Sequence, residues 1–377
     1  MSAVDLDGRT AELRWLATYR LPGPRPVAPI APAWSFVDDP SAWNAVWSVV
    51  RRHRIVGLLH TAYLDGAVAL AEDQAAQLTS THLDWCISML GLERRLLEVV
   101  DAFERAGLEL IVLKGTAVAH LDYPDPAMRM FGDNDVLVHP DQVQPALELL
   151  GDLGYHRPKA GASADFDRRF GKGATLRGPL GDELDVHRNL LFGTFGFALD
   201  IDELCASTTT FALGGRELPA LTAEMRLLHS CYHAALGDPD PRLNALRDIA
   251  QQARSDAYDP ALVRDIAERW QATAVLVRGL GLVRELLGVR DLGALSHVSE
   301  RYPSRAYERR AVASYVGANR SFAAKVRASL PFLPWRERAR FLRWVLLPSK
   351  EFVTTRGSRP GWPWMRRGLR SLRKGSR

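Results

Sequence analysis

The sequence predicts an α+β protein in which a small mixed β-sheet is flanked by helices, with helical regions before and after it in the chain. Short runs rich in β-branched residues, at 108–114 (LELIVLK) and 134–138 (NDVLV), are bounded by residues that break regular structure, as is typical of strands. The stretches 41–107 and 221–347 have the patterns and end signals of helices. These observations predict a sheet-containing core between two helical regions.

The composition is that of an ordinary globular protein. The chain has 377 residues, enough for one large domain or two, of which 47% are hydrophobic and 25% charged. It has no run of eighteen uncharged apolar residues, and its N-terminus is acidic where a signal peptide would be basic, so we expect a cytoplasmic protein. The three cysteines, Cys86, Cys205 and Cys231, are too scattered for a disulfide framework or a zinc knuckle.

The first 107 residues are expected to be helical apart from one extended arm. Residues 1–40 predict a short helix and a proline-rich arm, whose segment 21–33 (LPGPRPVAPIAPA) favours an extended chain. Residues 41–107 predict two helices and then a longer one over about 75–106, ended by Gly107. In that helix, apolar residues recur mostly at three- and four-residue intervals and predict one buried stripe: Met89, Leu92, Leu96, Val99, Val100 and Phe103.

Residues 108–220 are expected to form the core that carries the chemistry. Its predicted elements, in order, are the strand 108–114, a helix over 116–123, the strand 134–138, a helix over 140–153, and a hairpin of 174–177 and 183–187. The segment Gly171-Lys172-Gly173 lacks the spacing of a phosphate-binding P-loop and is expected to be a loop, for which covering the substrate stays open as a role.

Two further segments complete the chain. Residues 221–347 predict a C-terminal helical domain, with helix starts at Thr222, Pro260, Ser304 and Trp335. Residues 348–377 form a basic, Trp-containing tail. Thirteen Lys or Arg and two Glu lie within 336–377, so this end alone is more basic than the whole chain, whose net charge is +5. Three roles stay open for the tail: a solubilising end, contact with an anionic membrane, or binding of RNA or another polyanion.

Asp133 and Asp135 are the most informative pair of residues in the sequence. Successive side chains on a strand point to opposite faces, so these two share a face and Asn134 points away. Two carboxylates that close repel each other unless a cation lies between them, and hard divalent ions take oxygen ligands. A metal site is therefore the leading local hypothesis.

A third carboxylate lies on the later predicted strand. In the ELDVH segment, Asp185 and His187 share a strand face, with Glu183 on the same side. Asp185 could complete a cradle of three carboxylates around a metal. A carboxylate at a strand end that faces water is the alternative, and it would be the default if Asp185 stood alone.

These motifs in combination resemble a known family. The residues LKG at 113–115, Tyr123, Arg129, GDNDVLV at 132–138, GY at 154–155 and DVH at 185–187 resemble the uncharacterised bacterial nucleotidyltransferase family of the DNA polymerase beta-like nucleotidyltransferase superfamily. The segments LTAEMRLLHSCYHA at 221–234 and LLPSKEF at 346–352 are also similar to that family. The sequence departs from it at Asn134, where an aliphatic residue is usual, and at Arg188, where an aromatic one is usual.

The resemblance implies a fold and a site. The fold would be nucleotidyltransferase-like, and two Mg²⁺ ions, or Mn²⁺ in their place, would be held by Asp133, Asp135 and Asp185. Lys114 and Arg129 would bind the β- and γ-phosphates of a nucleoside triphosphate, and Gly115 would let backbone N–H groups approach them. His187 is a secondary candidate, because it shares a face with Asp185.

The helical side contains one competing candidate for a metal site. His229 and His233 have the spacing of zinc ligands on one helix, but no Glu follows His229 as a metalloprotease would require, so helix packing is favoured.

Two classes of function stay open. The first is a metal-dependent enzyme that transfers a nucleoside monophosphate, AMP by preference, from a nucleoside triphosphate to a small molecule, peptide or protein and releases pyrophosphate. The second is a catalytically idle nucleotidyltransferase fold that acts as a binding or regulatory protein. Neither the acceptor nor the base is encoded in a recognisable motif.

Overall fold

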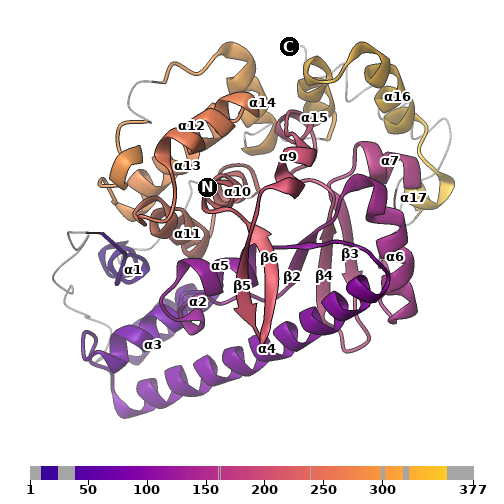
Figure 1. Cartoon of the computed structure of the whole chain (residues 1–377). Coiled ribbons are helices and arrows are strands. Elements are labelled where there is room, and N and C mark those ends of the chain that lie inside the picture. The colour runs from indigo at the N-terminus through magenta and orange to yellow at the C-terminus, as the bar shows by residue number, and fades with distance from the viewer. Residues whose placement is uncertain are drawn as a thin grey trace.

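A six-stranded mixed sheet lies at the centre of the computed structural model, which describes residues 10–23, 39–159, 161, 163–237, 239–298, 302–316 and 322–354 (Figure 1). The strand order is β3-β4-β2-β1-β6-β5, with parallel pairing between β2 and β4 and between β1 and β6. The strands are β1 Ile111–Leu113, β2 Asn134–Leu137, β3 Gly173–Arg177, β4 Glu183–His187, β5 Thr208–Leu213 and β6 Arg216–Leu221. The predicted α+β class is confirmed.

Helices precede, interrupt and follow the sheet. Up to β6 they are α1 Thr10–Ala17, α2 Pro40–Arg52, α3 Val56–Leu64, α4 Glu72–Arg105, α5 Lys114–Asp122, α6 Val143–Asp152, α7 Ala164–Arg169, α8 Thr194–Phe197 and α9 Ile201–Ala206. After it they are α10 Ala223–Tyr232, a π-helix His233–Gly237, α11 Leu243–Ala253, α12 Pro260–Arg269, α13 Thr273–Leu282, a π-helix Val283–Leu287, α14 Ala306–Val316, α15 Phe322–Ser329, α16 Trp335–Leu346 and α17 Lys350–Thr354. None of the described helices is long and apolar enough to cross a membrane.

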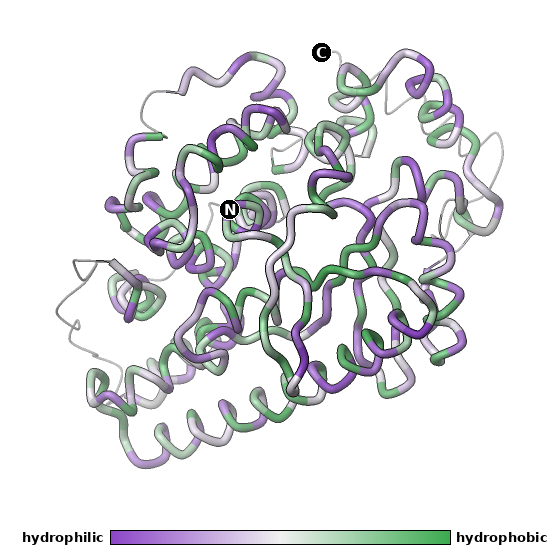
Figure 2. The backbone as a smooth tube through the Cα atoms, in the orientation of Figure 1, coloured by the Kyte–Doolittle hydropathy of each residue, from purple (hydrophilic) through white to green (hydrophobic). Residues whose placement is uncertain are grey.

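The long helix α4 runs along the sheet and buries the predicted stripe (Figure 1). Leu96, Val99 and Phe103 pack with Val112 of β1 and Val136 of β2 in one hydrophobic cluster. Figure 2 shows apolar and polar residues alternating along α4, as a helix with one buried face requires. The helix ends at Arg105, and the left-handed Gly107 (φ of 67°) that follows lets the N–H of Leu108 donate to Phe103 O (2.9 Å).

A second hydrophobic cluster joins helices from both ends of the chain. Leu16 of α1 and Trp47 of α2 belong to the same cluster as Leu228 of α10 and Leu246 of α11. Polar contacts reinforce this packing, because Arg247 Nη1 donates to the carbonyl of Ala17 (3.0 Å). The helices before and after the sheet thus share one core, while the division of the chain into five parts stays a prediction.

Most local predictions hold, with clear exceptions. The hairpin of β3 and β4 is confirmed, and so are the helix starts at Pro260 and Trp335. The strand predicted over 108–114 is shorter, because Leu108 completes the end of α4 and Lys114 already begins α5. The β5–β6 hairpin was missed although Gly214 and Gly215, with φ of 56° and 79°, are a turn signal between its strands. Most of the proline-rich arm, and the tail from residue 355 with Trp362 and Trp364, lie outside the described residues.

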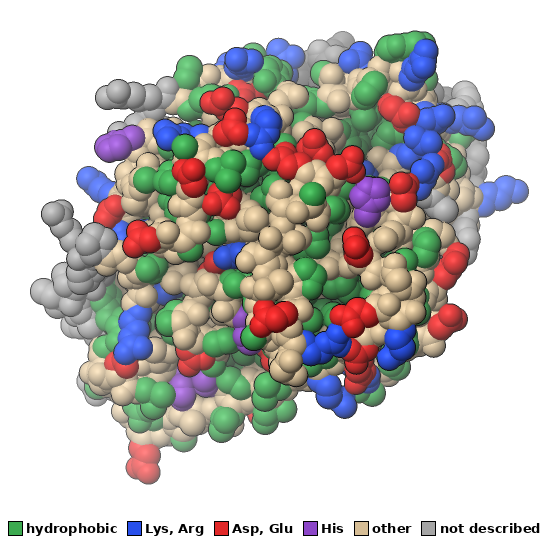
Figure 3. Space-filling model, viewed as in Figure 1, with side chains coloured by type: hydrophobic (Ala, Val, Ile, Leu, Met, Phe, Trp, Pro, Cys, Tyr) green, Lys and Arg blue, Asp and Glu red, His purple; other side chains and the backbone are tan. Residues whose placement is uncertain are grey.

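The face shown in Figure 3 has acidic and basic side chains interspersed with apolar ones. It offers no broad surface of one charge such as nucleic acid requires.

Truncating a buried leucine of α4 should cost far more stability than truncating an exposed one. Leu96 is 0% exposed and Leu90 is 64% exposed, so Leu96→Ala and Leu90→Ala are a matched pair on one helix. We expect Leu96→Ala to lower the free energy of unfolding by about 2–5 kcal/mol and Leu90→Ala by less than about 0.5 kcal/mol, measured by urea denaturation. Equal losses would contradict the placement of α4 on the sheet.

Stability should fall as the pH drops from about 6.5 to about 4. His53 is buried, and its Nδ1 accepts a hydrogen bond from the N–H of Leu243 (3.1 Å). Burial, then Arg52, lowers the pKa of His53 from 6.5 to about 4, so in this window the unfolded chain binds a proton that the folded chain does not. The variant His53→Gln should therefore lose less stability than the wild type between pH 7 and pH 4.5 in urea titrations. Identical losses would show that His53 is protonated in the folded protein.

Candidate active site

The parallel pairing of β2 with β4 brings three aspartates together. Asp135 of β2 is the register partner of Asp185 of β4, and Asp133 lies one residue before β2. Asn134 points to the other side, where its amide donates to the carbonyl of Leu92 (2.8 Å). The described residues contain two overlapping sets of metal-ligating side chains whose ligand atoms lie within 4.8 Å of one another: Asp135, Asp185 and His187, and Asp133, Glu183 and Asp185.

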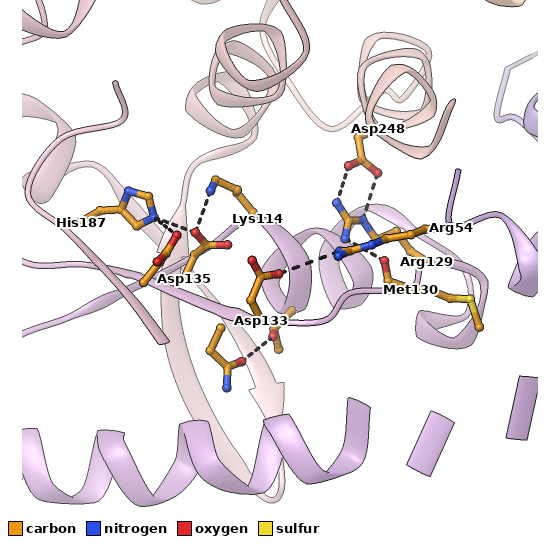
Figure 4. A network of polar contacts seen from close by, with 11 residues as sticks. Arg54, Lys114, Arg129, Met130, Asp133, Asp135, His187 and Asp248 are labelled. Atoms are coloured by element: carbon orange, nitrogen blue, oxygen red, sulfur yellow. Dashed lines mark hydrogen bonds and ion pairs between the residues drawn. The ribbon is translucent and has the colours of Figure 1, made fainter. Parts of the chain in front are cut away.

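Asp135 is a buried carboxylate held between two nitrogen donors. Its Oδ1 accepts hydrogen bonds from Lys114 Nζ (2.7 Å) and from His187 Nε2 (2.6 Å), as Figure 4 shows. Burial alone would raise the pKa of Asp135, but Lys114 and His187 outweigh burial and hold that pKa well below its usual range. Because both bonds fall on Oδ1, the second carboxylate oxygen is left for a further cation.

Asp133 is less well neutralised. Its nearest cationic atom is Arg54 Nη1, at 4.0 Å from Oδ1. Burial, then the charge of Asp135, raises the pKa of Asp133 above its usual value. An added positive charge beside Asp133 would therefore stabilise its ionised form.

Asp185 has one buried oxygen, Oδ1, without a hydrogen-bond partner among the described residues. Its Oδ2 lies 4.0 Å from His187 Nε2. A buried carboxylate oxygen without a partner costs free energy, and two further carboxylates beside it raise that cost. The site fits a hard divalent cation such as Mg²⁺ or Mn²⁺, because its donors are carboxylate oxygens and one of them is unsatisfied.

The two cations that face Asp133 and Asp135 sit on unusual backbone. Lys114 has φ of 39° and Arg54 has φ of 56°, and they are two of the four non-glycine residues with positive φ in the described part of the chain. Such conformations are unfavourable for residues with side chains and persist where the surrounding fold imposes them, often at functional sites. Next to Lys114, a Cβ on Gly115 would lie 2.8 Å from Phe131 Cβ, so only glycine lets α5 begin there.

A cavity of about 430 Å³ opens over these groups. Six of the residues selected from the sequence line it: Lys114, Gly115, Arg129, Asp133, Asp135 and Asp185. His187 does not line the cavity; it lies behind Asp135 and fixes that carboxylate. His187 therefore acts on the cavity through Asp135, and burial, then Lys172, lowers its pKa to about 4.

Arg129 is held by an acidic partner from the C-terminal helices. Its Nε and Nη2 donate to Asp248 of α11 (3.2 and 2.6 Å), and its Nη1 donates to the carbonyl of Met130 (3.2 Å). Tyr123 also donates to Asp248 (2.8 Å). Although burial opposes it, Asp248 raises the pKa of Arg129. The guanidinium fork predicted for phosphates is thus engaged within the protein.

Five further polar or charged residues on the cavity wall were not among the predicted site residues: Arg54, Lys172, His233, Arg242 and Asn244. No local motif marks Arg54, Arg242 or Asn244. Lys172 was passed over because its glycine-flanked loop is no P-loop, yet it lines the cavity, and burial, then Lys114, lowers its pKa to about 8. His233 was considered only as a zinc ligand; neither it nor His229 belongs to the metal-ligating sets of the described residues.

A model of one protein family covers more than half of the chain. The family model described as "Uncharacterised nucleotidyltransferase" matches residues 39–288. Among solved structures, the chain is similar to an antigenic nucleotidyltransferase-like protein from Paracoccidioides brasiliensis, with 17% identity over 52% of this chain and 92% of that chain, and a TM-score of 0.32. No curated protein matches the sequence. The family match confirms the expected resemblance.

Removing Asp248 should destabilise the protein strongly. Asp248→Ala leaves the Arg129 charge buried without its partner, so we expect the free energy of unfolding to fall by about 3–5 kcal/mol. The double variant Arg129→Met/Asp248→Ala should recover part of that loss. Asp265→Ala, which removes an exposed partner of Arg269, is the control and should cost less than about 1 kcal/mol in the same denaturation assay. A small loss for Asp248→Ala would argue that Arg129 is not fixed by this pair.

Proposed function

The chain belongs to the uncharacterised nucleotidyltransferase family, and we propose that it transfers a nucleoside monophosphate, most readily AMP, from a nucleoside triphosphate to a small molecule, a peptide or a protein. The observation that carries the proposal is the convergence of Asp133, Asp135 and Asp185 in one cavity, with the Oδ1 of Asp185 buried and unsatisfied. A chain that only bound other molecules would have no physical need to cluster three carboxylates there.

Asp133, Asp135 and Asp185 would hold the metal, most simply Mg²⁺, with Mn²⁺ as the alternative that the same oxygen donors allow. When bound, two such ions neutralise the charge that develops on the attacking and leaving oxygens during phosphoryl-type transfer. Asp135 would contribute its free oxygen, because Lys114 and His187 both occupy Oδ1. His187 is then a positioning residue that keeps this carboxylate oriented and ionised.

Lys114 and Gly115 form the proposed start of the triphosphate site. They lie at the N-terminus of α5, whose N-cap Leu113 provides no side-chain hydrogen bond, so the first N–H groups of the helix are available to an anion. Lys114 lines the cavity. Its ammonium is a compact charge on a flexible side chain, so it can pair with a phosphate in more than one position. Arg129 is held beside Asp248 and also lines the cavity. We therefore propose that it contributes to the positive potential of this wall without leaving Asp248.

The reaction that fits these residues is an in-line displacement. The acceptor oxygen forms a bond to the α-phosphorus, and the bond between that phosphorus and the oxygen bridging to the β-phosphate breaks. Pyrophosphate leaves with the electrons of that bond. We assign the proton of the acceptor hydroxyl to Asp185, whose carboxylate faces the cavity. Positioning and electrostatics supply most of the catalysis in such transfers.

The alternative is a catalytically idle nucleotidyltransferase fold that acts as a binding or regulatory protein. The cations already present favour this alternative, because Lys114 pairs with Asp135 and Arg54 lies beside Asp133. These cations offset part of the negative charge of the carboxylates without a metal. A protein of that kind would bind nucleotide without a need for divalent metal and would transfer no label.

Loss of two site carboxylates should abolish metal-dependent binding and transfer. We expect the wild type to bind at least one α-³²P-labelled nucleoside triphosphate in a Mg²⁺-dependent way and to label an acceptor in cell extract. The variant Asp133→Ala/Asp135→Ala should lose both, with binding at least about tenfold weaker. The control is Asp141→Ala/Asp202→Ala, whose side chains are 71% and 90% exposed.

The proposal fails if neither Mg²⁺-dependent binding nor label transfer separates the wild type from Asp133→Ala/Asp135→Ala. Circular dichroism must show that the variant is folded, because it removes the partner of Lys114. Nucleotide binding that needs no divalent metal, without transfer to any extract, would favour the idle alternative.

A further inference from the structure

Two arginines from outside the sheet region face the same cavity. Arg54 lies between α2 and α3, and Arg242 immediately precedes α11. Both line the cavity that holds Asp133, and no sequence motif links them. In Figure 4, Arg54 lies on the Asp133 side of the site and His187 on the other side of Asp135.

The fold holds these arginines close to each other. The N–H of Leu243, next to Arg242, donates to Nδ1 of His53, next to Arg54 (3.1 Å). Burial lowers the pKa of Arg54, and the charge of Arg242 lowers it further. Bringing two like charges together is unfavourable, so the arrangement is explained best by an anion that both arginines bind.

Arg54 has donors to spare where Arg129 has few. Among the described residues, the guanidinium of Arg54 makes no hydrogen bond, and its single ion pair, with Asp133, is 4.0 Å long. The side chain is 27% exposed, so it can reach a ligand in the cavity. Arg54 also has an unfavourable backbone conformation, with φ of 56°, although helices α2 and α3 on either side of it are regular.

The first turn of α11 adds to the positive charge of this wall. Pro241, Arg242, Asn244 and Ala245 line the cavity, and the N-cap residue Arg242 makes no side-chain hydrogen bond to the 11-residue helix, whose first N–H, that of Leu243, donates to His53. The helix dipole at this N-terminus favours an anion. Two guanidinium groups and a helix N-terminus together suit a ligand with several negative charges.

We propose that Arg54, Arg242 and the first turn of α11 bind the β- and γ-phosphates of the nucleoside triphosphate and then the departing pyrophosphate. This inference rests on the proposed function and adds three contacts to those of Lys114 and Gly115. Because Arg54 belongs to the helices before the sheet and Arg242 to those after it, nucleotide binding would tie both helical regions to the site.

The test compares ligands that differ in their phosphates. Calorimetry with Mg²⁺ would measure the binding of inorganic tripolyphosphate, ATP and AMP to the wild type and to Arg54→Gln, Arg242→Gln and Arg54→Gly. Glycine accepts the left-handed backbone, so Arg54→Gly should fold at least as well as Arg54→Gln. Arg51→Gln removes the same charge from an exposed site in α2 and is the matched control.

Each substitution at Arg54 or Arg242 should weaken tripolyphosphate and ATP binding by about tenfold or more, because charge-assisted hydrogen bonds are lost. AMP binding should change by less than about threefold, and Arg51→Gln should leave all three affinities unchanged. If the wild type binds ATP and tripolyphosphate but the variants bind them as tightly, or if AMP binding weakens as much as ATP binding, the inference is wrong and the proposed function stands. If the wild type binds no nucleoside triphosphate and no tripolyphosphate, both are wrong.

Discussion

The buried charge of Asp135 sets the requirements for the groups around it. A carboxylate that is 4% exposed must be neutralised by close cations or donors, since burial of an unpaired charge costs several kcal/mol or more. Lys114 and His187 meet that need at 2.7 and 2.6 Å, and Lys114 does so from a left-handed backbone at the end of β1. The parallel register of β2 and β4 then places Asp185 beside this group. The burial of Asp135, the left-handed backbone of Lys114 and the pairing of β2 with β4 therefore all belong to the same cluster of charges.

The features that could be predicted from the sequence are those that depend on patterns between residues close together in the chain. The alternation along GDNDVLV put Asp133 and Asp135 on one face, and the ELDVH strand added Asp185, as the paired strands now place them. Contacts between distant segments left no such pattern. Arg129 and Asp248 are 119 residues apart, so nothing in the sequence indicated that the arginine is held by α11. Arg54 was hidden for the same reason, because its neighbours in the cavity come from other parts of the chain.

The helices on either side of the sheet do more than cover it. They pack into one hydrophobic cluster, in which Leu16 and Leu246 both take part, and the hydrogen bond from Leu243 to His53 fixes the junction near the cavity. The strand ends supply the carboxylates, and the helical regions supply much of the opposing positive charge. This split lets a small sheet hold a site whose ligand would be larger and more highly charged than the strands alone could surround.

The place of α11 in the chain has a consequence for how the protein is made. The carboxylates are synthesised by residue 185, but the wall that carries Arg242, Asn244 and the partner of Arg129 follows nearly sixty residues later. A nascent chain that ends with its sheet complete therefore carries the three acidic groups before Arg242 and the rest of the α11 wall have been made. The cavity can close only when α11 emerges, so the order of synthesis delays its completion until the C-terminal helices can dock.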